Sequence, residues 1–268
     1  MLLQLILTPL GWLKNSVSVV AEDALLATLS AGPIPQHVAF ILDGNRRYAR
    51  SKDKQVNLGH TDGFYNLKKM LEVCIKMKVR CVSAYAFSIE NFKRSPGEVE
   101  ALMDLAEQKL LEFCEQGSIL EQYGIKLVVV GHKDMLPERV RAAAEKAEAL
   151  TAHHDRAIFN LCMPYTSRDE MTTAVQTCIQ ECLVNESMDS KISAEDIDAH
   201  LMTSLAGSPP LDILIRTSGV KRLSDYLLWQ CSEDTQLQFS NKYWPEFGML
   251  DFVPIILDYQ RKAWAQAS

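Results

Sequence analysis

Short β-branched runs alternate with longer amphipathic stretches from Gly32 onward. The period-two runs predict strands at residues 37–42, 80–87, 125–130, 156–162, 211–215 and 236–239. Apolar residues at helical spacing predict helices at residues 61–78, 96–122, 137–152, 167–183, 194–205 and 249–265. The clearest of these begins at Pro96, a residue well suited to a first helical turn.

This alternation predicts an α/β fold. Strands separated by helices of this length imply right-handed crossovers and a central, mostly parallel six-stranded sheet flanked by helices. Neither a low-complexity linker nor an internal repeat divides residues 32–268, which we therefore treat as one domain. In such sheets ligands lie beyond the carboxyl ends of the strands, so those positions are where chemistry is expected.

Residues 1–31 form a separate apolar segment that Pro9 and several polar residues interrupt. A membrane-spanning helix needs about 18 uninterrupted apolar residues, which this segment lacks. A secretory signal peptide is disfavoured because no basic region precedes the apolar stretch. Two interpretations stay open: a helix packed on its own domain, or an interfacial helix that meets a membrane surface or a partner through Leu5, Trp12, Leu13, Val17 and Val20.

Composition and charge exclude several classes of function. The chain has 268 residues, of which 47% are hydrophobic and 23% charged, so it can bury a sizeable core. Its net charge of −6 argues against a protein that coats nucleic acid, and any anion site must be local. Seven cysteines without a CxxC pair or zinc-finger histidines favour a reduced, cytosolic chain over a disulfide-stapled one.

A first polar cluster ends the strand at residues 37–42. Five basic residues fall between positions 46 and 54, against the single acid Asp53, and a helix opening near Asn45 would aim free N–H groups at a phosphate. Asp43 would repel that phosphate unless a divalent cation stands between them. The alternative is structural, with Asp43 as a helix N-cap and the arginines on a solvated helix face.

Two further clusters follow later strands, at residues 85–94 and 216–225. The first contains Ser88 and Asn91, which could equally form a turn with their own backbone hydrogen bonds. The second places Arg216, Arg222 and Ser224 around a glycine-containing loop suited to a second diphosphate. Because the three clusters share one edge of the predicted sheet, we expect them to converge.

These segments resemble the cis-prenyltransferase family, which includes undecaprenyl diphosphate synthase. The similarity lies in HVAFILDGNRRYA at residues 37–49, Gly59-His60, YAFSIENF at residues 85–92 and RTSG at residues 216–219. The matching blocks run in the family's order over residues 33–247. The stretches FSIENFKRS and RTSGVKRLSDYLLWQ are more similar to the eukaryotic dehydrodolichyl diphosphate synthase type than to the bacterial one.

The resemblance implies a reaction and a set of site residues. Isopentenyl diphosphate is added head to tail to an allylic diphosphate such as farnesyl diphosphate, giving a long-chain polyprenyl diphosphate for dolichol synthesis. Asp43 would hold Mg²⁺ on the allylic diphosphate, and Asn91 matches a position with a proton-accepting role. Because a neutral amide is a poor base, we expect Asn91 to orient the oxygen that takes the proton. The allylic diphosphate would be bound by Gly44, Asn45, Arg46, Arg47, Tyr48 and His60. Ser88, Glu90, Phe92 and Arg94 would lie between the reacting groups, and Arg216, Arg222 and Ser224 would bind isopentenyl diphosphate.

The resemblance also implies an apolar tunnel for the growing chain, walled by the helices at residues 61–78 and 96–122. Two features depart from the bacterial pattern. A metal-binding glutamate expected shortly before Trp244 is replaced by the segment QLQF at residues 236–239. The terminal Arg-x-Gly motif of single-subunit members is missing, so we expect a homologous accessory subunit, similar to the Nogo-B receptor, to supply it. The resemblance and the apolar segment 1–31 imply a peripheral location on the cytosolic face of the endoplasmic reticulum membrane.

Two rival functions fit the sequence less well. A non-catalytic accessory subunit of the same fold fits poorly, because such subunits typically lose the aspartate motif and keep Arg-x-Gly. A phosphohydrolase with Asp43 as nucleophile is the other rival. Enzymes of that kind place a second aspartate two residues on, where this chain has Asn45.

Overall fold

The computed structural model describes residues 22–184 and 191–267. Its centre is a six-stranded sheet with the order β3-β4-β2-β1-β5-β6, in which every neighbouring pair is parallel. The strands are β1 (His37–Ile41), β2 (Cys81–Tyr85), β3 (Ile125–Val130), β4 (Ala157–Cys162), β5 (Ile213–Arg216) and β6 (Gln236–Phe239). The predicted parallel α/β sheet is confirmed, and each strand lies within two residues or so of its predicted range.

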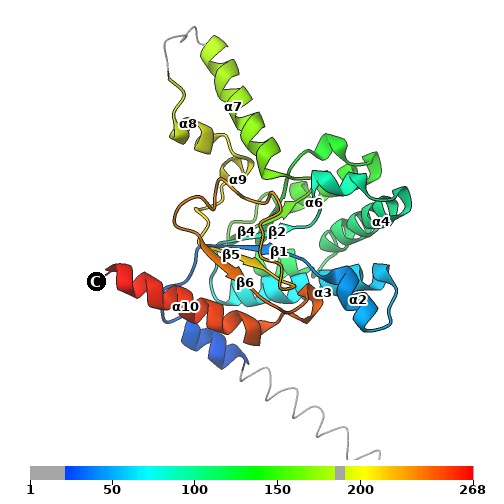
Figure 1. The fold of residues 1–268 in the computed structure, drawn as a ribbon, viewed down its shortest axis with the longest axis vertical. Coiled ribbons are helices and arrows are strands. Elements are labelled where there is room, and N and C mark those ends of the chain that lie inside the picture. The colour runs from blue at the N-terminus through cyan, green and yellow to red at the C-terminus, as the bar shows by residue number, and fades with distance from the viewer. Residues whose placement is uncertain (1–21, 185–190, 268) are drawn as a thin grey trace, which may run out of the picture.

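Each strand is connected to the next one in the chain by at least one helix, except that no helix lies between β5 and β6 (Figure 1). The α-helices are α2 (Asn45–Ser51), α3 (Val56–Lys76), α4 (Pro96–Phe113), α5 (Ile119–Tyr123), α6 (Glu138–Thr151), α7 (Ser167–Val184), α8 (Ala194–Ala199), α9 (Met202–Leu205) and α10 (Met249–Ala267). Short 3₁₀ turns are η1 (Ile89–Lys93), η2 (Lys133–Met135) and η3 (Trp244–Glu246). Helix α7 projects from the body of the molecule, with α8 beside it (Figure 1).

Two predicted helices are broken in the structure. The helix expected over residues 96–122 ends at Phe113, and Gly117 takes a positive φ of 73° before α5 begins. The helix expected over residues 194–205 divides into α8 and α9 because Leu201 is extended. Apolar spacing continues across both breaks, which is why periodicity alone joined the pieces.

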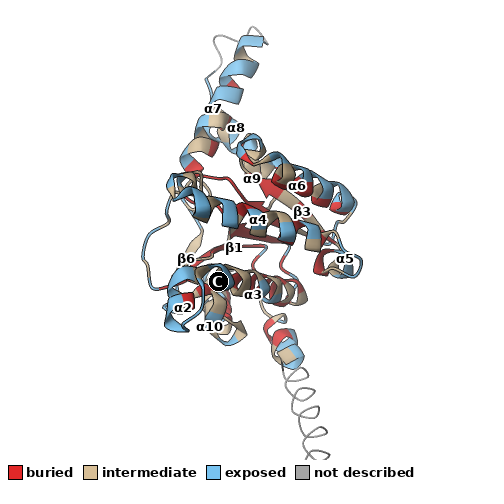
Figure 2. Cartoon of the chain, turned by 90° about the vertical axis from the view of Figure 1, so that its right-hand side faces the viewer, coloured by how far each residue is buried: buried red, intermediate tan, exposed pale blue. Residues whose placement is uncertain are grey.

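The sheet separates two apolar clusters. Along β1, Val38 and Phe40 face the larger cluster, while Ala39 and Ile41 face the smaller one. The larger cluster collects the inward faces of α3, α4, α6 and α10. Figure 2 shows the buried strands at the centre of the molecule, while α4 carries exposed residues on its outer surface. With both faces covered, the open carboxyl edge of the sheet becomes the place where polar groups can meet.

The described part of the N-terminal segment packs onto this body. Residues 22–29 are helical, and Leu26 and Leu29 are buried in the larger cluster. The positions predicted to face a membrane or partner, Leu5, Trp12, Leu13, Val17 and Val20, lie outside the described residues. Within residues 22–184 and 191–267, no helix has the length and apolar character needed to cross a bilayer.

Close packing of α2 against α3 requires a glycine. A Cβ built on Gly59 would lie 2.4 Å from the carbonyl oxygen of Asn45 and 2.8 Å from Cβ of Ala49. Both distances are far shorter than van der Waals contact, so a side chain here would push α2 away from α3. Gly59 thereby fixes where α2 begins at the sheet edge.

We therefore predict that Gly59→Ala lowers the free energy of unfolding by about 1–3 kcal/mol through overpacking. Gly97→Ala is the matched control, because a Cβ at that helical glycine meets nothing within 4 Å. The control should be neutral or slightly stabilising, since alanine favours a helix. Urea denaturation of both variants measures the difference, and equal stabilities would contradict the packing argument.

Candidate active site

A cavity of about 920 Å³ opens at the carboxyl edge of the sheet. It brings together the ends of β1, β2 and β5, as the strand-end clusters predict. The predicted site residues that line it are Asp43, Asn45, Arg46, His60, Ser88, Glu90, Asn91, Arg94, Arg216, Arg222 and Ser224. Four predicted residues lie outside the described lining: Gly44, Arg47, Tyr48 and Phe92.

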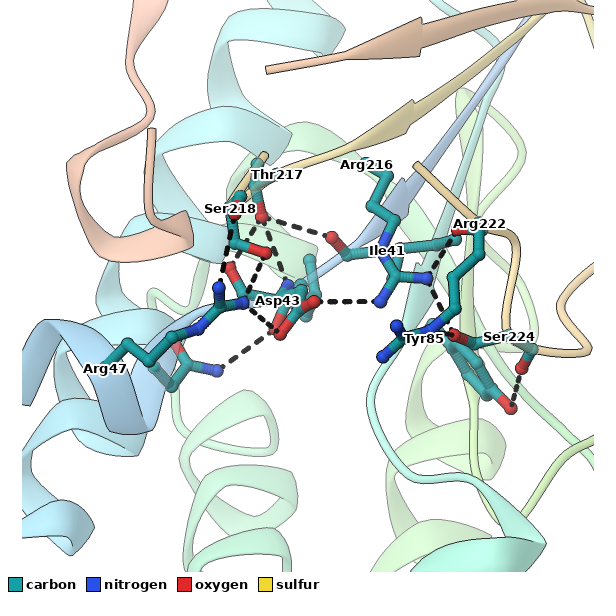
Figure 3. A network of polar contacts seen from close by, with 11 residues as sticks. Ile41, Asp43, Arg47, Tyr85, Arg216, Thr217, Ser218, Arg222 and Ser224 are labelled. Atoms are coloured by element: carbon teal, nitrogen blue, oxygen red, sulfur yellow. Dashed lines mark hydrogen bonds and ion pairs between the residues drawn. The ribbon is translucent and has the colours of Figure 1, made fainter. Parts of the chain in front are cut away.

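Asp43 is the hub of the polar network in Figure 3. Its Oδ2 accepts a hydrogen bond from Nη2 of Arg216 at 2.8 Å, and its Oδ1 accepts one from Nη2 of Arg47 at 3.3 Å. Thr217 holds the backbone, since its hydroxyl accepts from the amide of Asp43 at 3.1 Å and donates to the carbonyl at 2.8 Å. Asp43 is thus fixed from α2 and from the end of β5.

Two guanidinium groups keep this carboxylate ionised. Burial of Asp43 opposes ionisation and would raise its pKa, but hydrogen bonds from Arg216 and Ser218 and the charges of Arg216 and Arg47 outweigh it. The net pKa of Asp43 is therefore lowered from its ordinary value. An acid in this state accepts hydrogen bonds or binds a cation, and it is a poor proton donor.

Arg216 connects Asp43 to the loop after β5. The side chain is only 3% exposed, and its Nη1 donates to Oγ of Ser224 at 2.7 Å and to the carbonyl of Arg222. Its Nε is buried and has no hydrogen-bond partner among the described residues. One guanidinium therefore links the first and third polar clusters and retains an unused donor.

The start of α2 disproves the capping role considered for Asp43. The N-cap is Gly44, with a φ of 108°, and no side chain caps the helix. A Cβ on Gly44 would also lie 2.8 Å from Cδ1 of Tyr243. Positive φ and this close approach both require glycine at the position, which leaves the Asp43 carboxylate free to face the arginines.

Arg46 and Arg94 share one acidic hydrogen-bond partner, Glu98. Nη1 of each donates to Oε1 of Glu98, at 3.2 Å and 2.8 Å. Nearby, burial and the charges of Arg94 and Arg46 lower the pKa of His60 to about 4. The imidazole of His60 is therefore neutral at physiological pH, and its buried Nε2 has no partner among the described residues.

The second cluster, residues 85–94, adopts the turn that its sequence predicts as the alternative to a functional role. Oγ of Ser88 accepts from the amide of Glu90 at 3.2 Å, while Oδ1 of Asn91 accepts from the amide of Ser88 at 3.2 Å. This reciprocal capping box starts η1. Both side chains nevertheless line the cavity, so the turn positions them there.

The deeper wall of the cavity is largely apolar. The apolar lining residues come from α3, from α4 and from the end of β4 and the residue after it: Phe64, Leu67, Leu102, Leu105, Ala106, Leu110, Phe113, Leu161 and Met163. Phe64 and Phe113 pack with ring centroids 5.3 Å apart. The lining of the cavity thus combines charged groups from the carboxyl edge of the sheet with apolar side chains from α3 and α4.

Three of the four outlying residues still support the site from outside. Arg47 lies behind Asp43, where its Nη2 donates to Oγ of Ser218 at 2.6 Å. Phe92 packs on Phe87, at 4.9 Å between ring centroids, and Gly44 sets the turn. Tyr48 instead lies near Lys54, whose Nζ is 5.5 Å from its ring centroid.

Sequence reasoning missed Arg168, which lines the cavity from the start of α7. Its Nε donates to Oδ2 of Asp225 at 2.8 Å, and its backbone amide donates to Oδ1 at 3.0 Å. Arg168 thereby anchors the loop that carries Ser224. The residue follows β4, so applying the strand-end rule to that strand as well would have found it.

A family of prenyltransferases, described as undecaprenyl diphosphate synthase, matches residues 41–265 of this chain. The chain belongs to the cis-prenyltransferase family. Among its relatives is a dehydrodolichyl diphosphate synthase complex subunit of Schizosaccharomyces pombe, 43% identical over 255 residues, which cover 94% of this chain and 93% of the relative. The human dehydrodolichyl diphosphate synthase complex subunit is 39% identical over 254 residues, covering 94% of this chain and 74% of the relative.

Solved structures agree. Lavandulyl diphosphate synthase from Lavandula x intermedia, in complex with dimethylallyl diphosphate, superposes with a TM-score of 0.76 at 30% identity. The match covers 84% of this chain and 95% of the lavender enzyme. The fold predicted from the resemblance is therefore confirmed, and this cis-prenyltransferase is an enzyme.

The low pKa of His60 predicts a pH dependence of stability. Below pH 6.5 the unfolded imidazole takes up a proton, whereas the folded one does so only near pH 4. The unfolded state therefore binds more protons in this window, and the free energy of unfolding should fall as pH drops, by about 1 kcal/mol per pH unit.

Urea denaturation at about pH 7 and pH 5 measures this loss. His37, whose pKa burial also lowers to about 4, contributes in the same direction and is unchanged in a His60→Gln variant. The variant should lose less stability than the wild type across the window. Equal losses in the two proteins would show that His60 is protonated normally in the folded state.

Proposed function

We propose that the chain condenses isopentenyl diphosphate with an allylic diphosphate, such as farnesyl diphosphate, to make a long-chain polyprenyl diphosphate for dolichol synthesis. In this reaction a carbon–carbon bond forms, pyrophosphate leaves and one proton is lost. The observation that carries the proposal is the Asp43–Arg216 pair at the mouth of a cavity whose interior is apolar. The lavender enzyme's complex with an allylic diphosphate supports the substrate class.

The allylic diphosphate is assigned to the side of the cavity formed by α2 and α3. Arg46 and Arg94 supply charge there, and Asn45 adds its amide. Glu98 neutralises part of that charge until a diphosphate competes for the guanidinium groups. His60 is neutral, so its unpartnered Nε2 can hydrogen-bond to a phosphate oxygen without adding charge. Gly44 and Arg47 are proposed to position this diphosphate site from outside.

Asp43 is the proposed ligand of Mg²⁺. Magnesium commonly binds one or two carboxylates and completes its shell with substrate phosphates and water. The described residues hold no cluster of three or more His, Cys, Asp or Glu side chains suited to a metal, so a single carboxylate would have to suffice. Oδ1 of Asp43 has the weaker of its two arginine contacts, at 3.3 Å, and is the oxygen best able to exchange it. Bound Mg²⁺ would stabilise the charge that develops on the departing pyrophosphate.

The isopentenyl diphosphate is assigned to Arg216, Arg222 and Ser224. The unpartnered Nε of Arg216 and the exposed guanidinium of Arg222 offer donors on that side. Ser88, Glu90 and Phe92 are proposed to shape the boundary between the two substrates. Asn91 uses Oδ1 for the capping box, so we assign its NH₂ group to orient a diphosphate oxygen that accepts the proton.

The apolar interior suits the hydrocarbon. Water would capture an allylic cation, and burial of each added isoprene unit is favourable by the hydrophobic effect. Residues of α3 and α4 that line the cavity would therefore form the tunnel for the growing chain.

The chain is proposed to act as the catalytic subunit of a heteromer at the cytosolic face of the endoplasmic reticulum membrane. The S. pombe and human relatives are both named subunits of a complex. The partner would be a homologous, Nogo-B receptor-like subunit that supplies an Arg-x-Gly motif. A membrane location follows from the lipid nature of the product.

Asp43→Asn should reduce prenyl transfer by about 100-fold or more, because the amide neither binds Mg²⁺ well nor pairs with Arg216. Incorporation of labelled isopentenyl diphosphate into lipid, with farnesyl diphosphate and Mg²⁺, measures the loss. Chelation of Mg²⁺ should abolish activity in the wild type and restoration of the metal should recover it. Asp134→Asn, at a side chain 78% exposed and outside the cavity, is the control and should keep full activity.

The substitution also leaves Arg216 buried without a counterion, so a thermal unfolding curve must accompany the assay. Full elongation by folded Asp43→Asn would overturn the assigned role. Phosphate release without elongation in the wild type, lost in Asp43→Asn, would instead favour the rival phosphohydrolase.

Co-expression tests the heteromer. The chain purified with a homologous accessory subunit should elongate prenyl chains at least about 10-fold faster than the chain alone, since the partner completes a diphosphate-binding site with an arginine. The active fraction from size-exclusion chromatography should contain both chains. Full activity of the isolated chain would exclude a required partner while leaving the assignment of Asp43 intact.

A further inference from the structure

A second cavity lies beside the candidate active site. Its volume is about 540 Å³, and residues of α2, α3 and α4 line it. Arg46, His60, Leu102 and Leu105 line both this cavity and the larger one. The two cavities therefore adjoin on the side assigned to the allylic diphosphate. The proposed condensation itself gives the second cavity no role.

Two arginines of α2 line the second cavity. Arg46 and Arg50 are one helical turn apart, so their side chains lie on the same face of α2. The guanidinium of Arg46 is paired with Glu98 at 3.2 Å. The side chain of Arg50, in contrast, is exposed and forms no hydrogen bond or ion pair with any described residue. Arg50 therefore has all of its donors available for a ligand.

The beginning of α3 adds further donors. Val56 and Asn57, the first two residues of that helix, line the second cavity. No side chain caps α3, and its first turn contains no acidic residue. Backbone N–H groups at the start of a helix, together with the helix dipole, favour a bound anion. Arg50 and the start of α3 thus present positive charge to the same cavity.

Two acidic side chains also line the second cavity, but they do not cancel this charge. Oε1 of Glu98 accepts from both Arg46 and Arg94, at 3.2 Å and 2.8 Å. Asp104 pairs with Nη2 of Arg139 at 2.8 Å, and its side chain is 64% exposed, so water screens it. Within the described lining, Arg50 keeps a positive charge that no carboxylate neutralises.

The proposed elongation needs a way out for one of its products. When the allylic diphosphate gives up its hydrocarbon, pyrophosphate is left beside Arg46, Arg94 and His60. The diphosphate of the elongated product then lies at Arg216 and Arg222. Before the next condensation this diphosphate has to take the place of the pyrophosphate, so the pyrophosphate must leave first. The elongated product stands in the way on the Arg216 side, whereas the second cavity adjoins the other side.

We propose that the second cavity is an exit site for inorganic pyrophosphate, with Arg50 as its principal binding residue. This inference rests on the proposed prenyl elongation, which generates the pyrophosphate. The anion passes from Arg46 and His60 to Arg50 and the start of α3, and the vacated site receives the elongated diphosphate. Arg50 lies outside the described lining of the larger cavity, so it binds the released anion without holding the allylic substrate.

A single condensation in the active complex tests the exit. Rapid quenching measures formation of the carbon–carbon bond, and a coupled pyrophosphatase assay measures release of pyrophosphate into solution. Arg50→Gln should slow the release at least about 3-fold relative to bond formation, because a neutral amide no longer attracts the anion by charge. Arg50→Lys keeps the charge and should stay close to the wild type.

Binding of inorganic pyrophosphate tests the site without turnover. A non-reactive thio analogue of farnesyl diphosphate fills the allylic site, and isothermal titration calorimetry follows added pyrophosphate with Mg²⁺. Arg50→Gln should raise the Kd for pyrophosphate at least about 5-fold, while the KM for farnesyl diphosphate changes less than about 2-fold. Arg80→Gln is the matched control, since Arg80 is also exposed but precedes β2 at the amino edge of the sheet. The control should match the wild type in every measurement.

Unchanged release or an unchanged Kd in Arg50→Gln would overturn the exit site. A rise in the KM for farnesyl diphosphate as large as the rise in the Kd would also overturn it, because Arg50 would then bind the lipid diphosphate and not the free anion. A wild-type complex that forms no carbon–carbon bond would instead reject the proposed function. The calorimetric result stands apart from that failure, so the two are distinguishable.

Discussion

The buried ion pair between Asp43 and Arg216 organises the site. With Arg216 only 3% exposed, its charge is tolerable because a carboxylate and the loop after β5 surround it. The pair also ties β1 to β5, so the sheet edge and the polar groups depend on each other. Removing Asp43 would leave the buried charge of Arg216 without a counterion, which is far more damaging than losing an exposed contact. The Asp43–Arg216 pair therefore supports both the stability of the fold and the proposed chemistry of the site.

Much of this arrangement could be predicted from the sequence because parallel strands share one carboxyl edge. That rule brings together Asp43, Ser88 and Arg216, which lie far apart in the chain, without knowledge of any side-chain position. The alternation of residue types also predicts the sheet. The family resemblance then supplied chemical roles that spacing does not contain.

Other features depend on packing that spacing does not determine. The rotation of α2 about its axis places Arg46 in the cavity and Arg47 behind Asp43, although the two are adjacent in sequence. The apolar spacing continues across the break at Gly117. Periodicity therefore predicted a helix that runs past Phe113, where α4 ends. The burial of Lys109 could not be predicted, because a charged residue on an amphipathic helix suggests a solvated face, whereas here it is only 7% exposed and lines the cavity.

The loop that follows β5 has an unusual backbone. Ser218, Ser224, Asp225 and Leu227 all take positive φ values, of 78°, 54°, 60° and 46°, in a region that side chains disfavour. The hydrogen bonds from Arg216 and Arg168, together with the stacking of Tyr226 on Tyr85 at 4.3 Å, hold this shape. The conformational cost is thus met during folding, and the proposed diphosphate would meet a loop whose shape is already held by these contacts.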